Sequence, residues 1–477
     1  MTKTCRTAFI CLIVLLTLIL ACGKKNGTKP EPTKYKWTIL GYFDGNNPQD
    51  QTPEGHSYVI HDEQELEHID STQDIQVVVM LGSFKTGGNC KYYHIQSGLD
   101  KLPDSVSSEV LKDLGKTDMS DPTSLRDFIS FGMDKYPADH YLLIIDDHAG
   151  GWKGLCSDQI NGSGSWMSLS ELSSALSGFN FNIIWFYTPS MATAEVAYQI
   201  KDRADYMIAS QYKWYPEKIM GATIWLPYLT ENPNVEARDF AQEIPQAIDS
   251  AAHLIPGYKH FHAATIYLPR LSSLAEDISN LGKSMLDHAG SDWNEVWSAW
   301  EYAHNYTDLD SLSVDLRTFT QRIQNHTDLD STIKNRSQEV ETSISYTVIT
   351  QYLYPEYTNQ GGISIHFPWE ESGYDSVGYS QLLFSGTGWS DFLSAFITTY
   401  SGNYACTFDI KSIPTGARVY IDSIDTGDTT NVIIGGIYPG HHVVKLTKSG
   451  YKDWISANYT PNPQATQYVY AILTPSP

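Results

Sequence analysis

Residues 140–152 read His-Tyr-Leu-Leu-Ile-Ile-Asp-Asp-His-Ala-Gly-Gly-Trp, a continuous apolar run that ends in two carboxylates and a histidine. An uninterrupted run of this kind is typical of a strand buried on both faces of a parallel sheet. In an open α/β sheet, ligands and catalytic groups gather beyond the carboxyl ends of the strands. His148, on a glycine-rich turn after this strand, is therefore the first candidate functional residue.

The end of a second predicted strand is the other candidate region. Residues 181–188 form an apolar run that ends in Tyr187-Thr188-Pro189-Ser190-Met191, and a helix is predicted from Ala192. Between this end and the first lies a further predicted helix, residues 168–176. The second strand end is the other place where functional side chains are expected.

Strand and helix patterns alternate on both sides of these two ends. Upstream, Trp37 to Phe43 and Ile75 to Leu81 flank a helical stretch, and Asp121-Pro122 provides the capping side chain and first-turn proline of a helix start. The alternation continues for about 170 residues, which predicts an α/β layered domain with a mostly parallel sheet flanked by helices. Residues 210–400 are expected to complete the same domain, so its bounds are 35–400.

The pattern changes after residue 403 to short strands separated by turns, which predicts a small all-β sandwich over residues 404–475. Residues 412–422, Ser-Ile-Pro-Thr-Gly-Ala-Arg-Val-Tyr-Ile-Asp, and the later turns at 437–440 and 448–451 resemble a PEGA domain, although Thr415 replaces the glutamate of the eponymous motif. The resemblance implies a module of bacterial surface proteins without catalytic chemistry of its own.

The N-terminus has the pattern of an export signal. Lys3 and Arg6 precede an apolar run from Ala8 to Ala21, which is shorter than the roughly 20 residues that a membrane-spanning helix needs. The run ends in Leu-Ile-Leu-Ala-Cys22, which resembles the lipobox of bacterial lipoproteins. We therefore expect a signal peptide over residues 1–21, lipid attachment at Cys22, and a tether over residues 22–34 that holds the protein to the membrane of the cell envelope. An ordinary secretory signal with an incidental cysteine is the alternative.

Charge argues against a nucleic-acid partner. The chain has 55 acidic against 32 basic residues, a formal net charge of −23, whereas proteins that bind phosphate backbones show the opposite balance. The histidines show no metal-site spacing with cysteine or carboxylate partners, so neither a metal nor a cofactor is expected.

Three cysteines, Cys90, Cys156 and Cys406, remain beyond the signal and Cys22. Three is an odd number, so the chain has no complete disulfide framework. One disulfide bridge and one free thiol are compatible with the sequence, which does not indicate which two cysteines would pair.

Several segments together resemble one known family, the clostripain family of cysteine peptidases, which has a caspase-like fold. The resemblance runs from about Trp37 to Tyr400. It is carried by residues 136–145 leading into Asp147-His148-Ala-Gly-Gly-Trp152-Lys-Gly154, and then by Glu195-Val-Ala-Tyr198, residues 205–210, Gly362-Ile-Ser-Ile-His-Phe-Pro368 and Trp389-Ser-Asp-Phe-Leu393.

The resemblance assigns the family's catalytic roles to two positions. The general-base histidine of the family corresponds to His148. The family's Asp-Ala-Cys-Leu-Met motif, aligned on Met191 and residues 195–198, places the nucleophilic cysteine at Pro189 and the aspartate that recognises a basic P1 side chain at Tyr187. A proline has no nucleophile and no backbone N–H for an oxyanion hole, so one substitution removes two catalytic elements.

The sequence therefore predicts a catalytically degenerate envelope lipoprotein that acts in binding or display, with His148 retained as a relic. Its partner would be a protein, a peptide or a cell-wall ligand. Carbohydrate or peptide binding in the vacated cleft, against Trp152, Trp185 and Tyr187, is a further alternative, but the aromatic content favours placing these residues in a large core with many strands. The competing hypothesis is an endopeptidase that uses His148 with a displaced nucleophile, Ser190 or Cys156.

Overall fold

The computed structural model describes most of the chain beyond the first 33 residues. Cys22, the signal peptide and nearly all of the tether lie outside the described residues. None of the described helices is long and apolar enough to span a membrane. The described ranges are 34–68, 71–97, 102–212, 219–255, 261–288, 293–306, 312–353, 360–368, 373–403, 405–422, 424–437, 442–459, 461 and 465–476.

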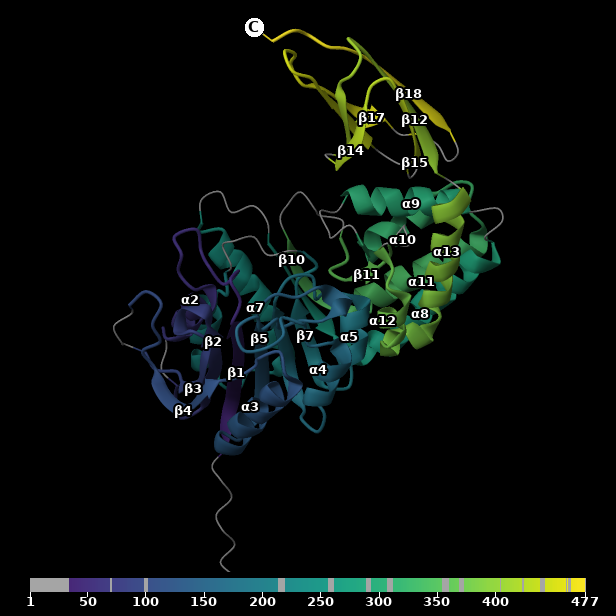
Figure 1. Ribbon diagram of the computed structural model, residues 1–477. Helices are drawn as coiled ribbons and strands as arrows, with labels where there is room; N and C mark the ends of the chain where they lie inside the picture. The colour runs from purple at the N-terminus through teal and green to yellow at the C-terminus, as the bar shows by residue number, and fades with distance from the viewer. Residues whose placement is uncertain are drawn as a thin grey trace, which may run out of the picture. The chain divides into compact units, whose positions relative to one another are not determined.

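A nine-stranded sheet forms the centre of the larger domain (Figure 1), in the order β10-β8-β7-β6-β5-β1-β2-β3-β4. Its five middle strands, from β7 to β2, are parallel to one another. At the two ends of this group, β8 pairs antiparallel with β7, and β3 pairs antiparallel with β2. The sheet thus confirms the predicted fold class. The strands are β1 (Tyr35–Gly45), β2 (Ile75–Ser83), β3 (Asn89–His94), β4 (Glu109–Lys116), β5 (Ala138–Asp146), β6 (Phe181–Tyr187), β7 (Ala204–Ala209), β8 (His262–Tyr267) and β10 (Val348–Leu353).

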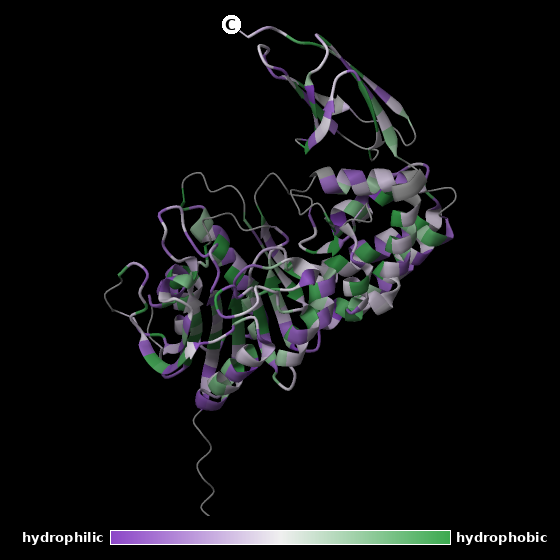
Figure 2. Ribbon diagram, viewed as in Figure 1, coloured by the Kyte–Doolittle hydropathy of each residue, from purple (hydrophilic) through white to green (hydrophobic). Residues whose placement is uncertain are grey.

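Helices cover both faces of this sheet, and each face has its own hydrophobic core. Alternate residues of β6 point to opposite cores: Phe186 lies in one and Tyr187 in the other. Strands buried on both sides explain the unbroken apolar runs of the sequence, which are green in Figure 2. The first face packs against α3 (Pro122–Lys135), α4 (Leu169–Ala175), α5 (Ala194–Ile200) and α8 (Leu271–Asp287), and the second against α2 (Tyr58–Leu66), α6 (Ala222–Glu231) and α7 (Ala237–Ala252).

Capping explains where α3 begins. The Asp121 side chain accepts a hydrogen bond from the backbone N–H of Thr123, and Pro122 occupies the first turn, as the sequence predicted.

The remainder of the domain extends the first core with further helices. Strand β11 (Ser364–His366) pairs with β9 (Ser313–Asp315) in a two-stranded sheet that is separate from the central one. The helices are α9 (Trp293–Tyr306), α10 (Leu316–Asn325), α11 (Ser331–Thr347), α12 (Ser376–Ser380) and α13 (Trp389–Asn403).

The C-terminal segment forms two small antiparallel or mixed sheets around a third core, which includes Phe408, Val419, Leu446 and Val469. It is a β domain, as predicted, with two strands, β14 and β17, that the sequence did not reveal because their residues are largely polar or exposed. The strands are β12 (Cys406–Ile413), β13 (Arg418–Ile421), β14 (Ile424–Thr429), β15 (Val432–Ile437), β16 (His442–Thr447), β17 (Trp454–Tyr459) and β18 (Thr466–Ile472).

Candidate functional site

The pairing of β5 with β6 brings the two predicted strand ends together. The strands are parallel, and Asp146 is the register partner of Tyr187. His148 and Pro189 each follow two residues later, so they leave neighbouring strands at the same level of the sheet. Both are half-buried. The structure thus places His148 and Pro189 just beyond the ends of two adjacent strands.

Glycines shape the turn that carries His148. Gly151 has φ of 60° and Gly154 has φ of 126°, in the region where a side chain is strained. A Cβ at Gly154 would lie 2.3 Å from the carbonyl oxygen of Met167. The turn is closed by the backbone N–H of Cys156, which donates to the His148 carbonyl oxygen at 3.1 Å. Only glycine allows this close return of the chain.

The side chain of Asp147, next to His148, holds the same turn in place through two hydrogen bonds. Its Oδ1 accepts a hydrogen bond of 2.8 Å from the Asn47 side chain, and its Oδ2 accepts one from the backbone N–H of Ser157. The anchoring joins the loop after β1 to both ends of the His148 turn. Asp147 is therefore a positioning residue for His148, a role that the sequence alone did not assign.

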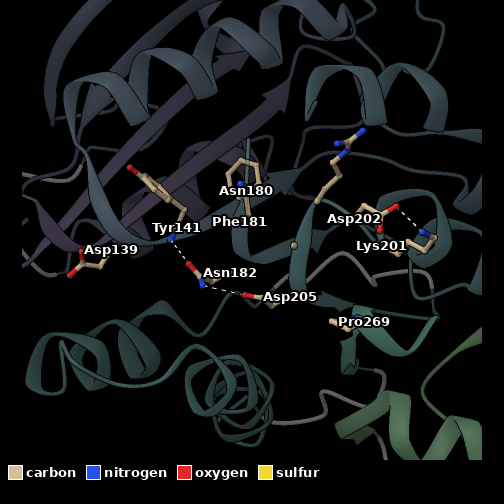
Figure 3. A pocket seen from close by; sticks show the side chains of 11 residues that line it. Asp139, Tyr141, Asn180, Phe181, Asn182, Lys201, Asp202, Asp205 and Pro269 are labelled. Carbon is tan, nitrogen blue, oxygen red and sulfur yellow. Dashed lines mark hydrogen bonds and ion pairs between the residues drawn. The ribbon is translucent and has the colours of Figure 1, made fainter. Parts of the chain in front are cut away.

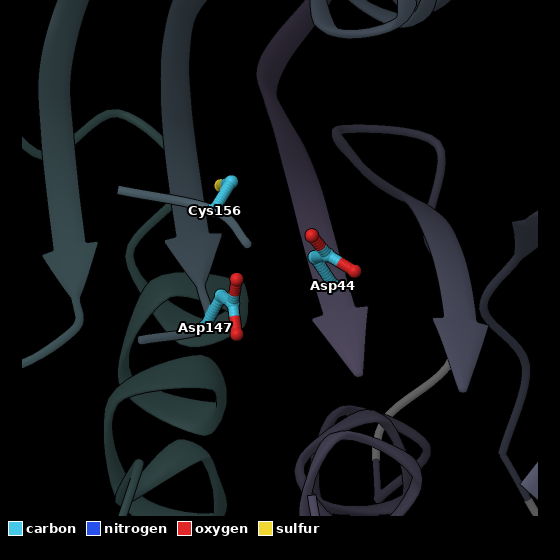
Figure 4. A group of neighbouring side chains, drawn as sticks. All are labelled: Asp44, Asp147 and Cys156. Carbon is cyan, nitrogen blue, oxygen red and sulfur yellow. The ribbon is translucent and has the colours of Figure 1, made fainter. Parts of the chain in front are cut away.

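Asp44, at the end of β1, faces Asp147 and Cys156, with candidate ligand atoms of the three residues within 4.8 Å of one another (Figure 4). Burial raises the pKa of the Asp44 carboxyl well above its ordinary value, and the nearby Asp147 and Asp158 raise it further. Asp44 accordingly keeps a proton more readily than an exposed aspartate does.

The same three residues fit a metal ion poorly. Asp44 accepts a hydrogen bond from the backbone N–H of Asn46, and both oxygens of Asp147 have protein donors. Hard cations prefer several oxygen ligands, and a thiol is not one of them. We read this group as a hydrogen-bonded acid pair that supports the turn.

The three cysteines in the described residues are free and buried, so no disulfide joins Cys90, Cys156 or Cys406. Cys156 is fully buried, and burial, followed by the charges of Asp147 and Asp44, raises the pKa of its thiol well above 9. A thiol of this kind is rarely ionised and meets no solvent. Cys156 is therefore unsuited to act as the displaced nucleophile.

Two of the three aromatic residues considered for the cleft belong to the core, which is the placement that the sequence favoured. Tyr187 and Trp185 are buried in the core that faces α6 and α7, where their rings make an edge contact with centroids 5.3 Å apart. Alternation along β6 points both side chains away from the His148 turn. Trp152, by contrast, does line a pocket.

That pocket lies beyond both strand ends and has a volume of about 110 Å³. The half-buried Ser190, with φ of 58°, contributes to its wall and approaches the turn, since a Cβ at Gly151 would lie 3.0 Å from the Ser190 carbonyl oxygen. Lining residues are Gly150, Gly151, Trp152, Lys153, Trp166, Ser190, Thr193, Glu195, Leu312, Ser313 and His366.

Sequence reasoning missed two members of this pocket, Glu195 and His366. Glu195 Oε1 accepts hydrogen bonds from the backbone N–H of His366 and from the Tyr379 hydroxyl, both at 2.9 Å. Burial raises the pKa of Glu195. Both residues belong to segments quoted for the family resemblance, but nothing in their local patterns shows that segments 171 residues apart meet.

A second, more open cavity of about 510 Å³ lies at the opposite edge of the sheet, where β5, β6 and β7 begin (Figure 3). Its polar groups pair with one another: Asn182 accepts from the Tyr141 backbone N–H and donates to Asp205, and Lys201 lies 2.7 Å from Asp202. These pairs leave the cavity without a convergent set of functional groups.

The fold and the paired strand ends define a class, the layered α/β proteins with the fold of C11 peptidases. The model of the clostripain family matches residues 43–396, and the chain therefore belongs to the clostripain family. The PEGA domain model matches residues 406–476.

Solved structures agree with this assignment at the level of the fold. A secreted C11 cysteine protease from Bacteroides thetaiotaomicron, in complex with an irreversible peptide inhibitor, has a TM-score of 0.55 and 20% identity, covering 75% of this chain and 99% of its own. An inactive zymogen C11 protease from Parabacteroides distasonis has a TM-score of 0.55 and 17% identity, with the same coverage. No curated protein matches the chain.

Proposed function

We propose that this chain is a non-catalytic member of the clostripain family that binds peptide segments at the bacterial cell surface without cleaving them. One observation carries the proposal: Pro189 stands at the end of β6, level with His148 at the end of β5. Proline offers neither a nucleophile nor an amide N–H. Loss of one oxyanion donor alone typically slows such reactions by about 10² to 10³.

Binding is supported by what remains at the site. The glycine turn and Trp152 border a pocket next to the two strand ends, which offers a place for part of a ligand. The Bacteroides relative carries a peptide inhibitor, which makes a peptide the favoured class of ligand for this chain. Tyr187, where the family has an acidic residue, is buried, so the bound peptide needs no basic side chain.

Surface location is part of the same proposal. The lipobox-like end of the signal, with lipid on Cys22, would tether the protein to the envelope, and the PEGA domain is typical of surface proteins. The similar Bacteroides protease is secreted, which supports export of this chain.

A displaced nucleophile is the second candidate, and one observation favours Ser190 for it: this serine is half-buried and lines the pocket. Cys156 lacks that exposure.

Peptide capture separates the two proposals. A random peptide library is incubated with immobilised protein, and both the bound and the free peptides are identified by mass spectrometry. We expect bound peptides that remain intact. Cleavage that disappears in Ser190→Ala but persists in the matched exposed variant Ser170→Ala would establish the displaced-nucleophile mechanism instead. Absence of any captured peptide would contradict peptide binding.

A further inference from the structure

The pocket beside the glycine turn holds two buried polar atoms without a protein partner of normal geometry. Glu195 is 0% exposed, and while its Oε1 has two donors, its Oε2 has none. His366 is 2% exposed, and its Nε2 also lacks a partner. Buried polar groups are nearly always hydrogen-bonded, so two such atoms lining one pocket point to a ligand.

The hydrogen bonding of the His366 ring indicates which partner its Nε2 needs. We assign the ring proton to Nδ1, on the side of the Leu312 backbone, because Nε2 has no partner. Burial, followed by the charge of Lys153, lowers the pKa of His366 to about 3, so the ring is neutral. In a neutral ring with the proton on Nδ1, Nε2 is an acceptor. The ligand must therefore donate a hydrogen bond there.

Size limits the ligand to one small group. An apolar cavity of about 150 Å³ holds benzene, with six heavy atoms, so a pocket of about 110 Å³ holds roughly four or five. A sugar ring with its substituents exceeds this number, whereas one amino-acid side chain does not. Aromatic rings form two of the walls: Trp166, which is 38% exposed, lies against Gly150, and the Trp152 ring lies 5.1 Å from that of His366.

The charged residues of the pocket limit which side chain of that size it can bind. The exposed Lys153 and the buried Glu195 both line the pocket, and their opposite charges offset each other, so neither a cation nor an anion is favoured there. An uncharged carboxamide offers two N–H donors on one nitrogen, which suits two neighbouring acceptors, and has four or five side-chain heavy atoms in Asn or Gln.

We propose that this pocket is a specificity site that takes the carboxamide side chain of an Asn or Gln in the bound peptide, with Glu195 and His366 accepting its hydrogen bonds. The inference rests on the proposed peptide-binding function. The site is distinct from the position of the family's P1 acid, because Tyr187 belongs to the core on the other face of the sheet, whereas Trp152 belongs to the core on this face.

The test compares the composition of peptides captured by the purified full-length protein with that of the input library. We expect Asn and Gln to be enriched roughly fivefold to tenfold over Leu, Asp, Glu and Lys at one position, the gain of one or two buried hydrogen bonds. Ser313→Trp, at the register partner of His366, fills the pocket and should abolish the enrichment, whereas the exposed Ser170→Trp should retain it.

A charge variant checks the selection without disturbing the core. Lys153→Glu should raise capture of Lys-containing peptides relative to Asn-containing peptides at least fivefold, and Lys116→Glu, an equal charge change on exposed β4, should not. Thermal unfolding of each variant verifies that it is folded. Captured peptides with a flat composition, preference for Lys or Arg in the unmodified protein, or enrichment that survives Ser313→Trp would overturn the specificity site while leaving peptide binding intact. No capture at all would instead refute the proposed function.

Discussion

Pro189 lies two residues beyond the end of β6, level with His148 beyond β5, and the proposed loss of peptidase activity rests on this residue. The surrounding residues are those of a supported site: Asp147 anchors the turn through Asn47 and Ser157. In the proposed non-catalytic protein, position 189 carries no thiol for His148 to activate. A cysteine introduced at position 189 tests directly whether His148 can influence a thiol there.

Replacing Pro189 with cysteine should create a reactive thiol. The three cysteines in the described part of the chain are buried, so among these three and position 189, iodoacetamide should label only position 189 in folded Pro189→Cys. His148→Ala in that background should slow the labelling at neutral pH, because a neighbouring imidazolium lowers a thiol pKa. Mass spectrometry of labelled peptides provides the measurement. Equal labelling with and without His148 would show that the two positions do not interact.

Asp44 should make stability depend on pH. Its pKa is raised in the folded state, so folding favours the protonated carboxyl, and the resulting stabilisation is full below the ordinary aspartate pKa of about 4 and lost as pH rises through the folded-state pKa. Asp44→Asn mimics the protonated form and should raise Tm by about 2–4 °C at pH 8 but not at pH 4. The exposed Asp134→Asn is the control. A destabilised Asp44→Asn at pH 8 would contradict the raised pKa of Asp44.

Of the structural elements around the candidate site, the turn from the end of β5 to residue 156 contributes most to its shape. The main features of this turn were predictable from the sequence. The apolar run predicted β5, and Gly150-Gly151 predicted a tight turn that presents His148. The orientation of Tyr187 was not predictable, because a buried strand has apolar residues on both faces and the alternation gives no sign of which face is which. The pairing of β11 was not predictable either, because its partner strand β9 lies about 50 residues upstream in the sequence and has only three residues.

Two glycines allow a matched measurement on this turn. Gly154→Ala combines a positive φ with a Cβ 2.3 Å from the Met167 carbonyl oxygen, and we expect it to lower the free energy of unfolding by about 2–4 kcal/mol. Gly178 also has positive φ, 87°, but no atom within 4 Å of its Cβ, so Gly178→Ala should cost only about 1 kcal/mol. Urea unfolding of both variants gives the comparison. Equal losses would mean that the close return of the chain does not constrain the turn.

For the molecule as a whole, the fold class and the two kinds of domain were predictable from strand and helix alternation followed by short strands. The separate third core, formed within residues 408–473, leads to a prediction about folding. Removal of residues 404–477 should leave the peptidase-like part folded, with its Tm within a few degrees of the intact chain, as measured by calorimetry. Loss of the cooperative transition of that part would show that the C-terminal β domain is required for its stability.

Lipid attachment is the whole-molecule prediction that lies outside the described residues. Metabolic labelling with an alkynyl fatty acid should mark the full chain, and Cys22→Ser should abolish both the label and the recovery of the protein with membranes. Persistent membrane recovery of Cys22→Ser would indicate a different means of attachment.

The central claim, that the chain binds without cleaving, is tested most directly by hydrolysis of fluorogenic peptides that end in Lys, Arg, Asn or Gln. The unmodified protein and His148→Ala should show the same rate, equal to that of buffer. Turnover by the unmodified protein that is lost in His148→Ala would contradict the claim and direct the search for a nucleophile to Ser190.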